Sequence, residues 1–152
     1  MIWWWRASEA PLGAPAAVQP LDDEPDLSSQ SLEELATLIT DGPPGRRHWF
    51  LSPAVNELCR RGPPAIPVVL DLILSDDRNA RGRAIAVLVG VTQDMHGFRN
   101  GVGWPTREHE VAWRRFWESL GNIDKDSPRA DRQRAINLWR QWLHAGRPIQ
   151  KP

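Results

Sequence analysis

The sequence has a single cysteine, Cys59, among its 152 residues. One cysteine excludes an intrachain disulfide and any zinc site built from several thiolates, and its apolar neighbours Val55 and Leu58 indicate a core position. The formal net charge is zero, so the molecule as a whole carries no excess charge that would indicate a nucleic-acid or membrane partner. No apolar run approaches the roughly 20 residues that a transmembrane helix needs.

Signature motifs of catalysis and nucleotide binding are also missing. The chain contains no GxGxxG, no Walker A loop, no HExxH and no GxSxG. Residues 101–103 are a lone GxG that opens no strand–turn–helix unit. Four side chains near it could converge on a metal (Asp94, His96, His109 and Glu110), but their spacing matches no ligand motif and surface histidines explain them better. We therefore expect no catalytic residue, no cofactor and no metal.

The stretch from Gly62 to Val91 has the clearest pattern and predicts two helices joined by a tight acidic turn. The first half has an apolar stripe with helical spacing: Ile66, Val69, Leu70 and Ile73. The second half has another: Ala80, Ala84, Val87, Leu88 and Val91. A buried strand is the rival interpretation of residues 66–74, and Pro67 inside that run argues against it. Two short amphipathic helices bury their faces by pairing, so we predict an antiparallel hairpin.

Two helices are expected before this unit. Ser31 and Glu34 form a capping box that begins the first helix, and Gly-Pro-Pro-Gly at 42–45 ends it. The second helix is expected over residues 48–61, with Ser52 and Pro53 as an alternative start.

Two more helices are expected after it. The fifth has the stripe His109, Trp113, Phe116, Trp117 and Leu120, and the last has Ile136, Trp139, Trp142 and Leu143. We expect Trp117 and Trp139 to meet in one buried cluster; the alternative is an exposed platform on which sugars or bases stack.

Residues 94–106 interrupt the helical pattern with three glycines and a proline, so we predict a loop. Connections of this length are often functional. We expect Trp104 to attach the loop to the body, and we include Phe98 and Trp104 in a candidate interaction surface.

One segment recurs. Residues 75–85, SDDRNARGRAI, align without a gap with residues 126–136, DSPRADRQRAI. Identical residues lie at five corresponding positions: Arg78 and Arg129, Arg81 and Arg132, Arg83 and Arg134, Ala84 and Ala135, Ile85 and Ile136. This recurrence indicates repeated helical hairpins.

The repeated hairpin resembles a HEAT repeat, the unit of armadillo-like α-solenoids. The residues that match are Pro67, the apolar runs 68–70 and 72–74, Asp76-Asp77, Arg81, Ala84 and Leu88. The Trp-rich ending RQRAINLWRQWL is similar to the last helix of some bacterial HEAT-like proteins. The resemblance covers about residues 30–146 and implies an all-α, short right-handed superhelix of about three hairpins. It also implies bonds between a turn aspartate and a helix arginine of neighbouring repeats.

The function implied by this resemblance is that of a non-enzymatic scaffold that binds a protein partner. The alternative is a nucleic-acid-binding HEAT-like domain of the DNA glycosylase type, in which Arg78, Arg81, Arg129 and Arg132 would contact phosphates. Because aspartates lie nearby in the sequence, local salt bridges are the simpler interpretation of these four arginines. We include the four arginines, with Phe98 and Trp104, in the candidate interaction surface. We expect a cytoplasmic protein.

The two parts of the chain differ in charge. Residues 1–45 carry eight acidic side chains and one arginine, and the remainder carries eleven acidic and eighteen basic side chains, which gives −7 and +7. We expect residues 1–27 to be an irregular segment and residues 28–148 to form the helical domain. The acidic segment is either a solvated tail or a cover for the basic body. Trp3, Trp4 and Trp5 could contact a membrane interface, begin a truncated reading frame or attach to the helical body.

Overall fold

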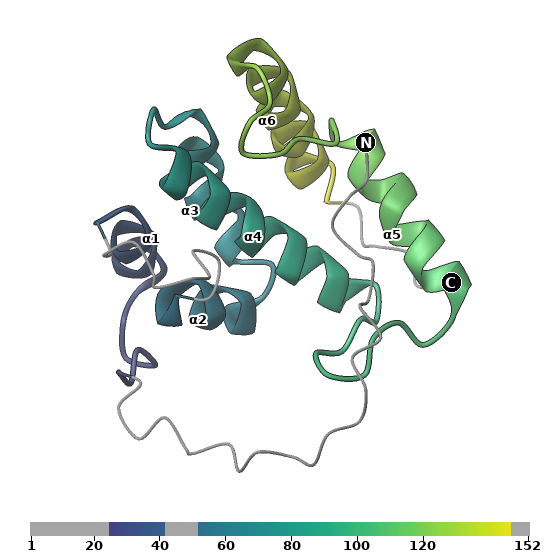
Figure 1. Ribbon diagram of the computed structural model, residues 1–152, viewed down its shortest axis with the longest axis horizontal. Coiled ribbons are helices and arrows are strands. Elements are labelled where there is room, and N and C mark those ends of the chain that lie inside the picture. The colour runs from purple at the N-terminus through teal and green to yellow at the C-terminus, as the bar shows by residue number, and fades with distance from the viewer. Residues whose placement is uncertain (1–24, 42–51, 147–152) are drawn as a thin grey trace, which may run out of the picture.

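The computed structural model describes residues 25–41 and 52–146, and these ranges are helical throughout apart from turns and loops (Figure 1). The elements are α1 (Leu32–Asp41), α2 (Pro53–Arg61), α3 (Ala65–Leu70), the 3₁₀ helix η1 (Asp71–Leu74), α4 (Arg78–Met95), α5 (Arg107–Ser119) and α6 (Arg129–His144). Within the described ranges the only extended pairing is one isolated bridge between Arg99 and Gly103. The all-α prediction is therefore confirmed for these residues.

Side-chain caps begin the first two helices. Ser31 Oγ accepts from Glu34 N at 3.1 Å and Ser31 N donates to Glu34 Oε2 at 2.7 Å, which is the predicted capping box. Ser52 caps α2 by accepting from Val55 N at 3.2 Å, and Pro53 occupies the first helical turn. Of the two starts predicted for the second helix, the later one is confirmed; residues 48–51 lie outside the described ranges.

The helix predicted over residues 66–74 is not uniform. It begins as α3 and tightens into η1 after Leu70, and Ser75 N bonds to Leu72 O at 3.1 Å. Such tightening of a last turn is common because it satisfies carbonyls that the helix leaves free. The predicted stripe survives the change, since Ile66, Val69 and Ile73 are completely buried.

The helix α4 is the centre of the fold. It contacts α1, α2, α3 and η1, while α5 and α6 lie beyond it on the opposite side from α1 and α2 (Figure 1). Its predicted stripe, from Ala80 to Val91, is buried. The predicted end of this helix was too early, because residues 94 and 95 belong to α4 and not to the loop. Thr92 and Gln93 are buried although polar, and this hid the continuation of the stripe.

Aromatic side chains fill the space around α5 and α6. Trp117 and Trp139 are 8% and 1% exposed, so the predicted buried cluster is confirmed. Phe116 and Trp142 complete it through edge-on contacts with ring centroids 5.4 Å apart. These large side chains bury the apolar faces of both helices.

Two expectations reach beyond the described residues. Of the segment 1–27, only residues 25–27 are described, and they form neither helix nor strand. The predicted domain end at residue 148 also lies outside. None of the described helices has the length and apolar character needed to cross a bilayer.

Candidate interaction surfaces

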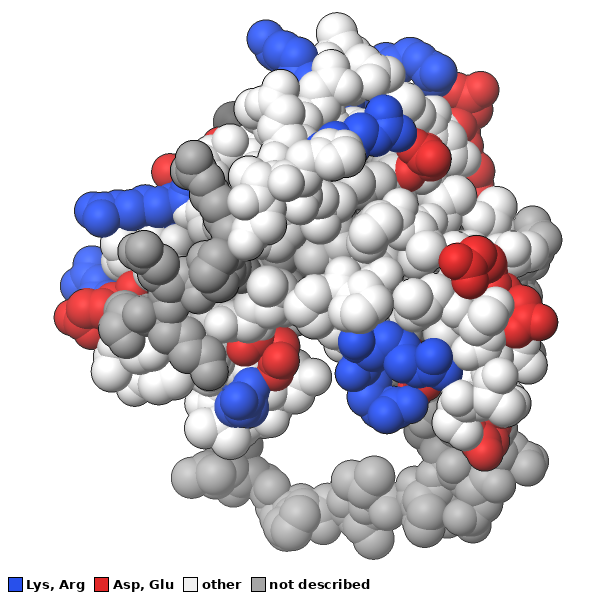
Figure 2. Space-filling model, turned by 180° about the vertical axis from the view of Figure 1, so that it is seen from behind, with Lys and Arg blue, Asp and Glu red and all other residues white. Residues whose placement is uncertain are grey.

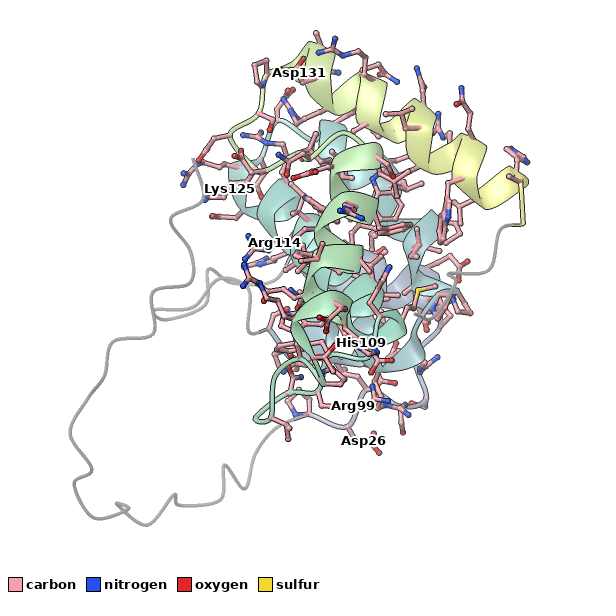
Figure 3. All side chains as sticks on the ribbon, turned by 90° about the vertical axis from the view of Figure 1, so that its right-hand side faces the viewer. Asp26, Arg99, His109, Arg114, Lys125 and Asp131 are labelled. Atoms are coloured by element: carbon pink, nitrogen blue, oxygen red, sulfur yellow. The ribbon has the colours of Figure 1, made fainter. Side chains whose placement is uncertain are left out.

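The six candidate residues occupy two separate places in the fold. Arg78, Arg81, Arg129 and Arg132 lie around the turns that precede α4 and α6, whereas Phe98 and Trp104 lie in the loop after α4. The 18 residues of α4 separate the two sets by about 27 Å, at 1.5 Å per residue. Figure 3 shows the same separation, with Lys125 near one end of α5 and Arg99 near the other. They therefore do not form one surface.

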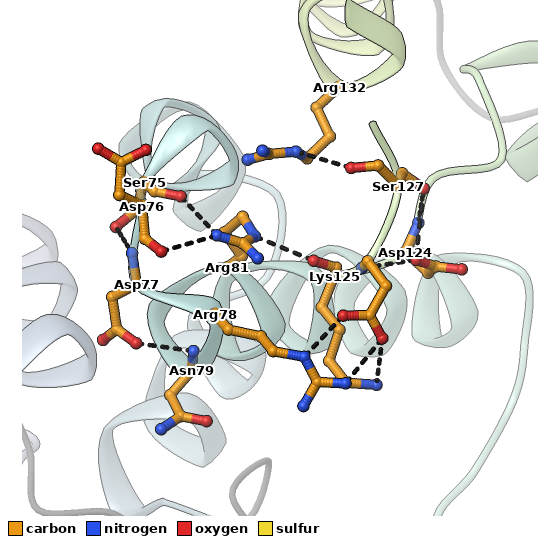
Figure 4. A network of polar contacts seen from close by, with 11 residues as sticks. Ser75, Asp76, Asp77, Arg78, Asn79, Arg81, Asp124, Lys125, Ser127 and Arg132 are labelled. Carbon is orange, nitrogen blue, oxygen red and sulfur yellow. Dashed lines mark hydrogen bonds and ion pairs between the residues drawn. The ribbon is translucent and has the colours of Figure 1, made fainter. Parts of the chain in front are cut away.

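The first set joins the two copies of the repeated turn, which we call the paired turns (residues 73–78 and 124–129). Arg78 donates two hydrogen bonds to the Asp126 carboxylate, from Nε at 2.6 Å and from Nη2 at 2.7 Å (Figure 4). Its counterpart Arg129 donates to Asp76 Oδ1 at 3.3 Å and to the carbonyl oxygen of Leu74 at 3.1 Å. Each turn therefore supplies an arginine to the other.

The second arginine of each copy bonds to backbone carbonyls on both sides. Arg81 donates to the carbonyl of Asp76 in its own turn at 3.0 Å and to that of Lys125 in the other at 2.9 Å (Figure 4). Arg132 donates to Ser127 O at 3.0 Å and to Ile73 O at 2.6 Å. The second arginine of each copy therefore bonds both to its own turn and to the other turn.

These hydrogen bonds determine how easily the four arginines could bind another molecule. Arg132 is only 7% exposed, and burial together with Arg81 and Arg129 lowers its pKa. The hydrogen bonds from Arg78 lower the pKa of the Asp126 carboxyl to about 2, so this pair remains ionised at neutral pH. A phosphate would have to displace carboxylate or carbonyl partners that are already well placed. These bonds connect the paired turns to each other.

The second set, Phe98 and Trp104, lies at the base of a small hairpin in the loop after α4. Arg99 N donates to Gly103 O at 3.0 Å and Gly103 N donates to Arg99 O at 2.8 Å. The turn between them needs glycine because Gly101 and Gly103 have φ angles of +78° and +96°. Val102 stands at the tip and is 85% exposed, the largest exposed fraction among the large apolar side chains of the described ranges. The hairpin thus presents one apolar side chain to solvent.

Stacked rings fix the base of this hairpin. Phe98 and Trp104 meet edge to face with centroids 5.1 Å apart, and Trp104 lies 5.7 Å from Trp113 of α5. Trp113 is held in turn by a hydrogen bond from Nε1 to Thr92 Oγ1 of α4 at 3.0 Å. The prediction that Trp104 attaches the loop to the body is confirmed. Ring contacts therefore hold the base of the hairpin against α5, and through Trp113 against α4.

The sequence missed a buried histidine at the start of this loop. His96 is 4% exposed, and its Nδ1 donates to Thr92 O at 2.7 Å, since a carbonyl can only accept. Burial lowers its pKa, the Thr92 bond opposes this, and His109 adds a smaller lowering effect. No sequence signal was available for this, because helical periodicity does not distinguish a buried histidine from an exposed one.

The four residues that could have converged on a metal are engaged elsewhere. Asp94 pairs with Arg99 at 2.5 Å, and Glu110 pairs with Arg114 at 2.5 Å. His109 Nδ1 hydrogen-bonds to Thr106 Oγ1 at 2.9 Å. The described part of the chain contains no group of three or more His, Cys, Asp or Glu side chains arranged to hold an ion.

Charge is mixed on the face that Figure 2 draws. Figure 2 shows basic and acidic side chains in small separate groups over one face, with uncharged surface between them and no continuous positive stripe. Several groups are local ion pairs, such as Arg60 and Arg61 with Glu57, which lower the pKa of that carboxyl to about 2. Comparison of the chain with protein family models, with curated proteins and with solved structures gave no match.

Proposed function

We propose that this chain is a non-enzymatic, HEAT-like helical scaffold that binds a protein partner through the hairpin at residues 99–103. The observation that carries the proposal is Val102, which is 85% exposed at the tip of a hairpin whose base is fixed by Phe98, Trp104 and Trp113. A fixed apolar tip loses little conformational entropy on binding, and a protein pocket is the environment that would bury it.

The arrangement of the helices as a short right-handed superhelix of about three hairpins is part of the same proposal. Its support is the recurrence of residues 75–85 at 126–136 and the matching use of Arg78 and Arg129 in the paired turns. Arg78 and Arg129 make the arginine–aspartate bonds between copies, whereas Arg81, the arginine that matches the HEAT pattern, bonds to backbone carbonyls. A cytoplasmic location belongs to the proposal too, and a single unpaired cysteine is compatible with it.

The nucleic-acid alternative has weaker support. Binding to phosphates needs guanidinium groups that are free to reach them, and the four arginines that would do so are bonded to Asp76, Asp126 and backbone carbonyls. On the face drawn in Figure 2 the charge is mixed, and this face has no positive stripe of the kind that an extended phosphate backbone would contact.

The test is site-specific photocrosslinking from the hairpin tip. A photoreactive amino acid replaces Val102 in one sample and the exposed Asn137 of α6 in a matched control, and both are irradiated in extract of the native host. We expect one discrete protein adduct from position 102 that is absent from position 137. In parallel, the unlabelled chain is titrated into fluorescent double-stranded DNA and single-stranded RNA at low salt. Salt-sensitive binding to either nucleic acid, together with no protein adduct from position 102, would overturn the proposal.

A further inference from the structure

Asn100 and Gly101 form the only Asn-Gly dipeptide in the sequence. Asparagine is among the chemically labile residues, because the next backbone nitrogen can attack its side-chain amide and close a succinimide ring. Glycine favours this ring closure, since it has no Cβ to obstruct the approach and its backbone rotates freely. The dipeptide lies in the hairpin at residues 99–103, directly before Val102.

The structure leaves both reacting groups free. Asn100 and Gly101 are exposed, and neither the Asn100 side chain nor the Gly101 N–H is hydrogen-bonded to a described residue. Apart from its neighbours in the chain, no described heavy atom lies within 4 Å of the position that a Cβ of Gly101 would occupy. The bonds that close the hairpin come from Val102 N and Gly103 N, which donate to Arg99 O at 3.1 and 2.8 Å. They therefore do not occupy the nitrogen that attacks.

The other four asparagines lack this combination, although all are exposed: Asn56, Asn79, Asn122 and Asn137. Each precedes a residue that has a Cβ. Three of them lie inside α2, α4 and α6, where regular helical geometry restricts the rotation that ring closure needs. The fourth, Asn122, precedes the buried and β-branched Ile123. Exposure alone therefore does not distinguish Asn100, but exposure together with the open, unbonded Gly101 does.

We propose that Asn100 is a site of spontaneous modification, which converts it to isoaspartate through a succinimide. A solvent base takes the proton of the Gly101 N–H, and a bond forms between this nitrogen and Asn100 Cγ. The bond from Cγ to Nδ2 breaks, and the nitrogen leaves as ammonia after taking up a proton from solvent. Water then adds to one of the two imide carbonyls. Opening at Cγ gives aspartate, and opening at the backbone carbonyl carbon gives isoaspartate.

The two products affect the hairpin differently. Aspartate adds a negative charge and keeps the length of the main chain. Isoaspartate adds a carbon atom to the main chain between Arg99 and Gly103 and leaves the former backbone carbonyl as a free carboxylate. The two bonds between Arg99 and Gly103, at 3.0 and 2.8 Å, depend on the original loop length. Isoaspartate should therefore open the hairpin that presents Val102. The reaction needs only water, so it does not depend on any partner of Val102.

The test is incubation of the full-length chain in mildly alkaline buffer at physiological temperature, followed by mass spectrometry of chymotryptic peptides. Chymotrypsin cleaves after Phe98 and Trp104, which releases position 100 in one short peptide. We expect progressive loss of the unmodified peptide and the appearance of two products, which electron-transfer fragmentation identifies as aspartate and isoaspartate. Peptides that contain the other four asparagines should stay intact, and an unincubated sample gives the background of the digestion.

Two alanine variants separate the missing Cβ from the strain of the hairpin. Gly101→Ala should slow the loss severalfold, because a Cβ then obstructs the attack. Gly103→Ala is the matched control: it also places alanine at a positive φ angle in the same hairpin, and it should not slow the loss. Amide hydrogen exchange at Gly103 reports on the hairpin itself. It should become faster in the isoaspartate form and stay unchanged in Asn100→Asp.

Three results would overturn the proposal. The first is loss at position 100 that is no faster than loss at Asn122. The second is equal slowing by Gly101→Ala and Gly103→Ala, which would assign the rate to the hairpin conformation and not to the missing Cβ. The third is unchanged amide exchange at Gly103 in the isoaspartate form, which would mean that the product leaves the hairpin intact.

Discussion

Trp117 of α5 and Trp139 of α6 meet edge to face, with ring centroids 5.8 Å apart and planes inclined by 72°. These two helices, which residues 120–128 connect, press their bulkiest side chains together at this point. Trp139 also contacts the rings of Phe116 and Trp142, so one side chain links the inner faces of both helices. Trp117 and Trp139 thus belong to the core and do not form an exposed platform for sugars or bases.

Replacement of Trp139 by alanine should lower the free energy of unfolding by about 3–5 kcal/mol, because a completely buried indole is lost and its neighbours collapse only partly. Chemical denaturation read by circular dichroism measures the loss. The neighbouring Leu138→Ala, which truncates a 37% exposed side chain, is the control and should cost much less. An unchanged midpoint for Trp139→Ala would mean that the cluster does not support the fold.

Arg132→Met should be more destabilising than any substitution of the exposed arginines around it. The change removes this donor from the carbonyls of Ile73 and Ser127, and the buried Ile73 carbonyl left unsatisfied costs about 1–3 kcal/mol. Arg132→Lys should not restore stability, since one ammonium group cannot reproduce the forked geometry of a guanidinium. Arg134→Met, which loses only a contact with Asp131 on the same helix, serves as the control. Equal unfolding midpoints for the two methionine variants would contradict a bridging role for Arg132.

Gly121→Ala should destabilise the protein more than Gly101→Ala. Both glycines have positive φ angles, +104° and +78°, so alanine is strained at each. Only at Gly121 would the new Cβ also lie 2.8 Å from the Cβ of Ala135 on α6. Thermal unfolding of the two variants compares them directly. A smaller loss at Gly121 would indicate that the turn before α6 is not packed as closely as the structure shows.

Stability should fall as the pH decreases below the ordinary histidine pKa of 6.5, and His96 should contribute to that fall. Burial lowers the pKa of His96 in the folded protein, so the unfolded chain takes up its proton first and gains free energy relative to the native state. The loss begins near pH 6.5 and is complete below the folded pKa. His96→Phe keeps a ring against Phe116 and should show a shallower decrease in unfolding free energy over this range. Identical pH profiles for the two proteins would contradict the assignment.

The helices could be predicted from sequence because their signals are local. The stripe around Val69, the second stripe around Val87 and the capping box at Ser31 each depend on residues within a few positions of one another. Each of these features lies where the sequence placed it. The burial of Trp139 followed from the same periodicity.

The features that could not be predicted from the sequence depend on distant residues or on small differences in helix geometry. The 3₁₀ segment at 71–74 differs from an α-helix only in its hydrogen-bond register, which the apolar stripe does not report. The reciprocal bonds of Arg81 and Arg132 reach carbonyls up to 59 residues away, and no sequence motif specifies a backbone carbonyl. Grouping these arginines with Trp104 was reasonable from composition, but the length of α4 separates them.

The most direct test of the central claim uses the protein partner captured by crosslinking from position 102. The purified partner is titrated with the Val102→Asp variant. The substitution adds a charge to an exposed tip, so the melting temperature should stay close to that of the parent chain, because surface substitutions of this kind usually change stability by no more than about 0.5 kcal/mol. We predict that isothermal titration calorimetry detects binding to the parent chain and to the control Asn100→Asp, and none to Val102→Asp. Undiminished binding by a folded Val102→Asp variant would contradict the account that the hairpin tip is the contact surface.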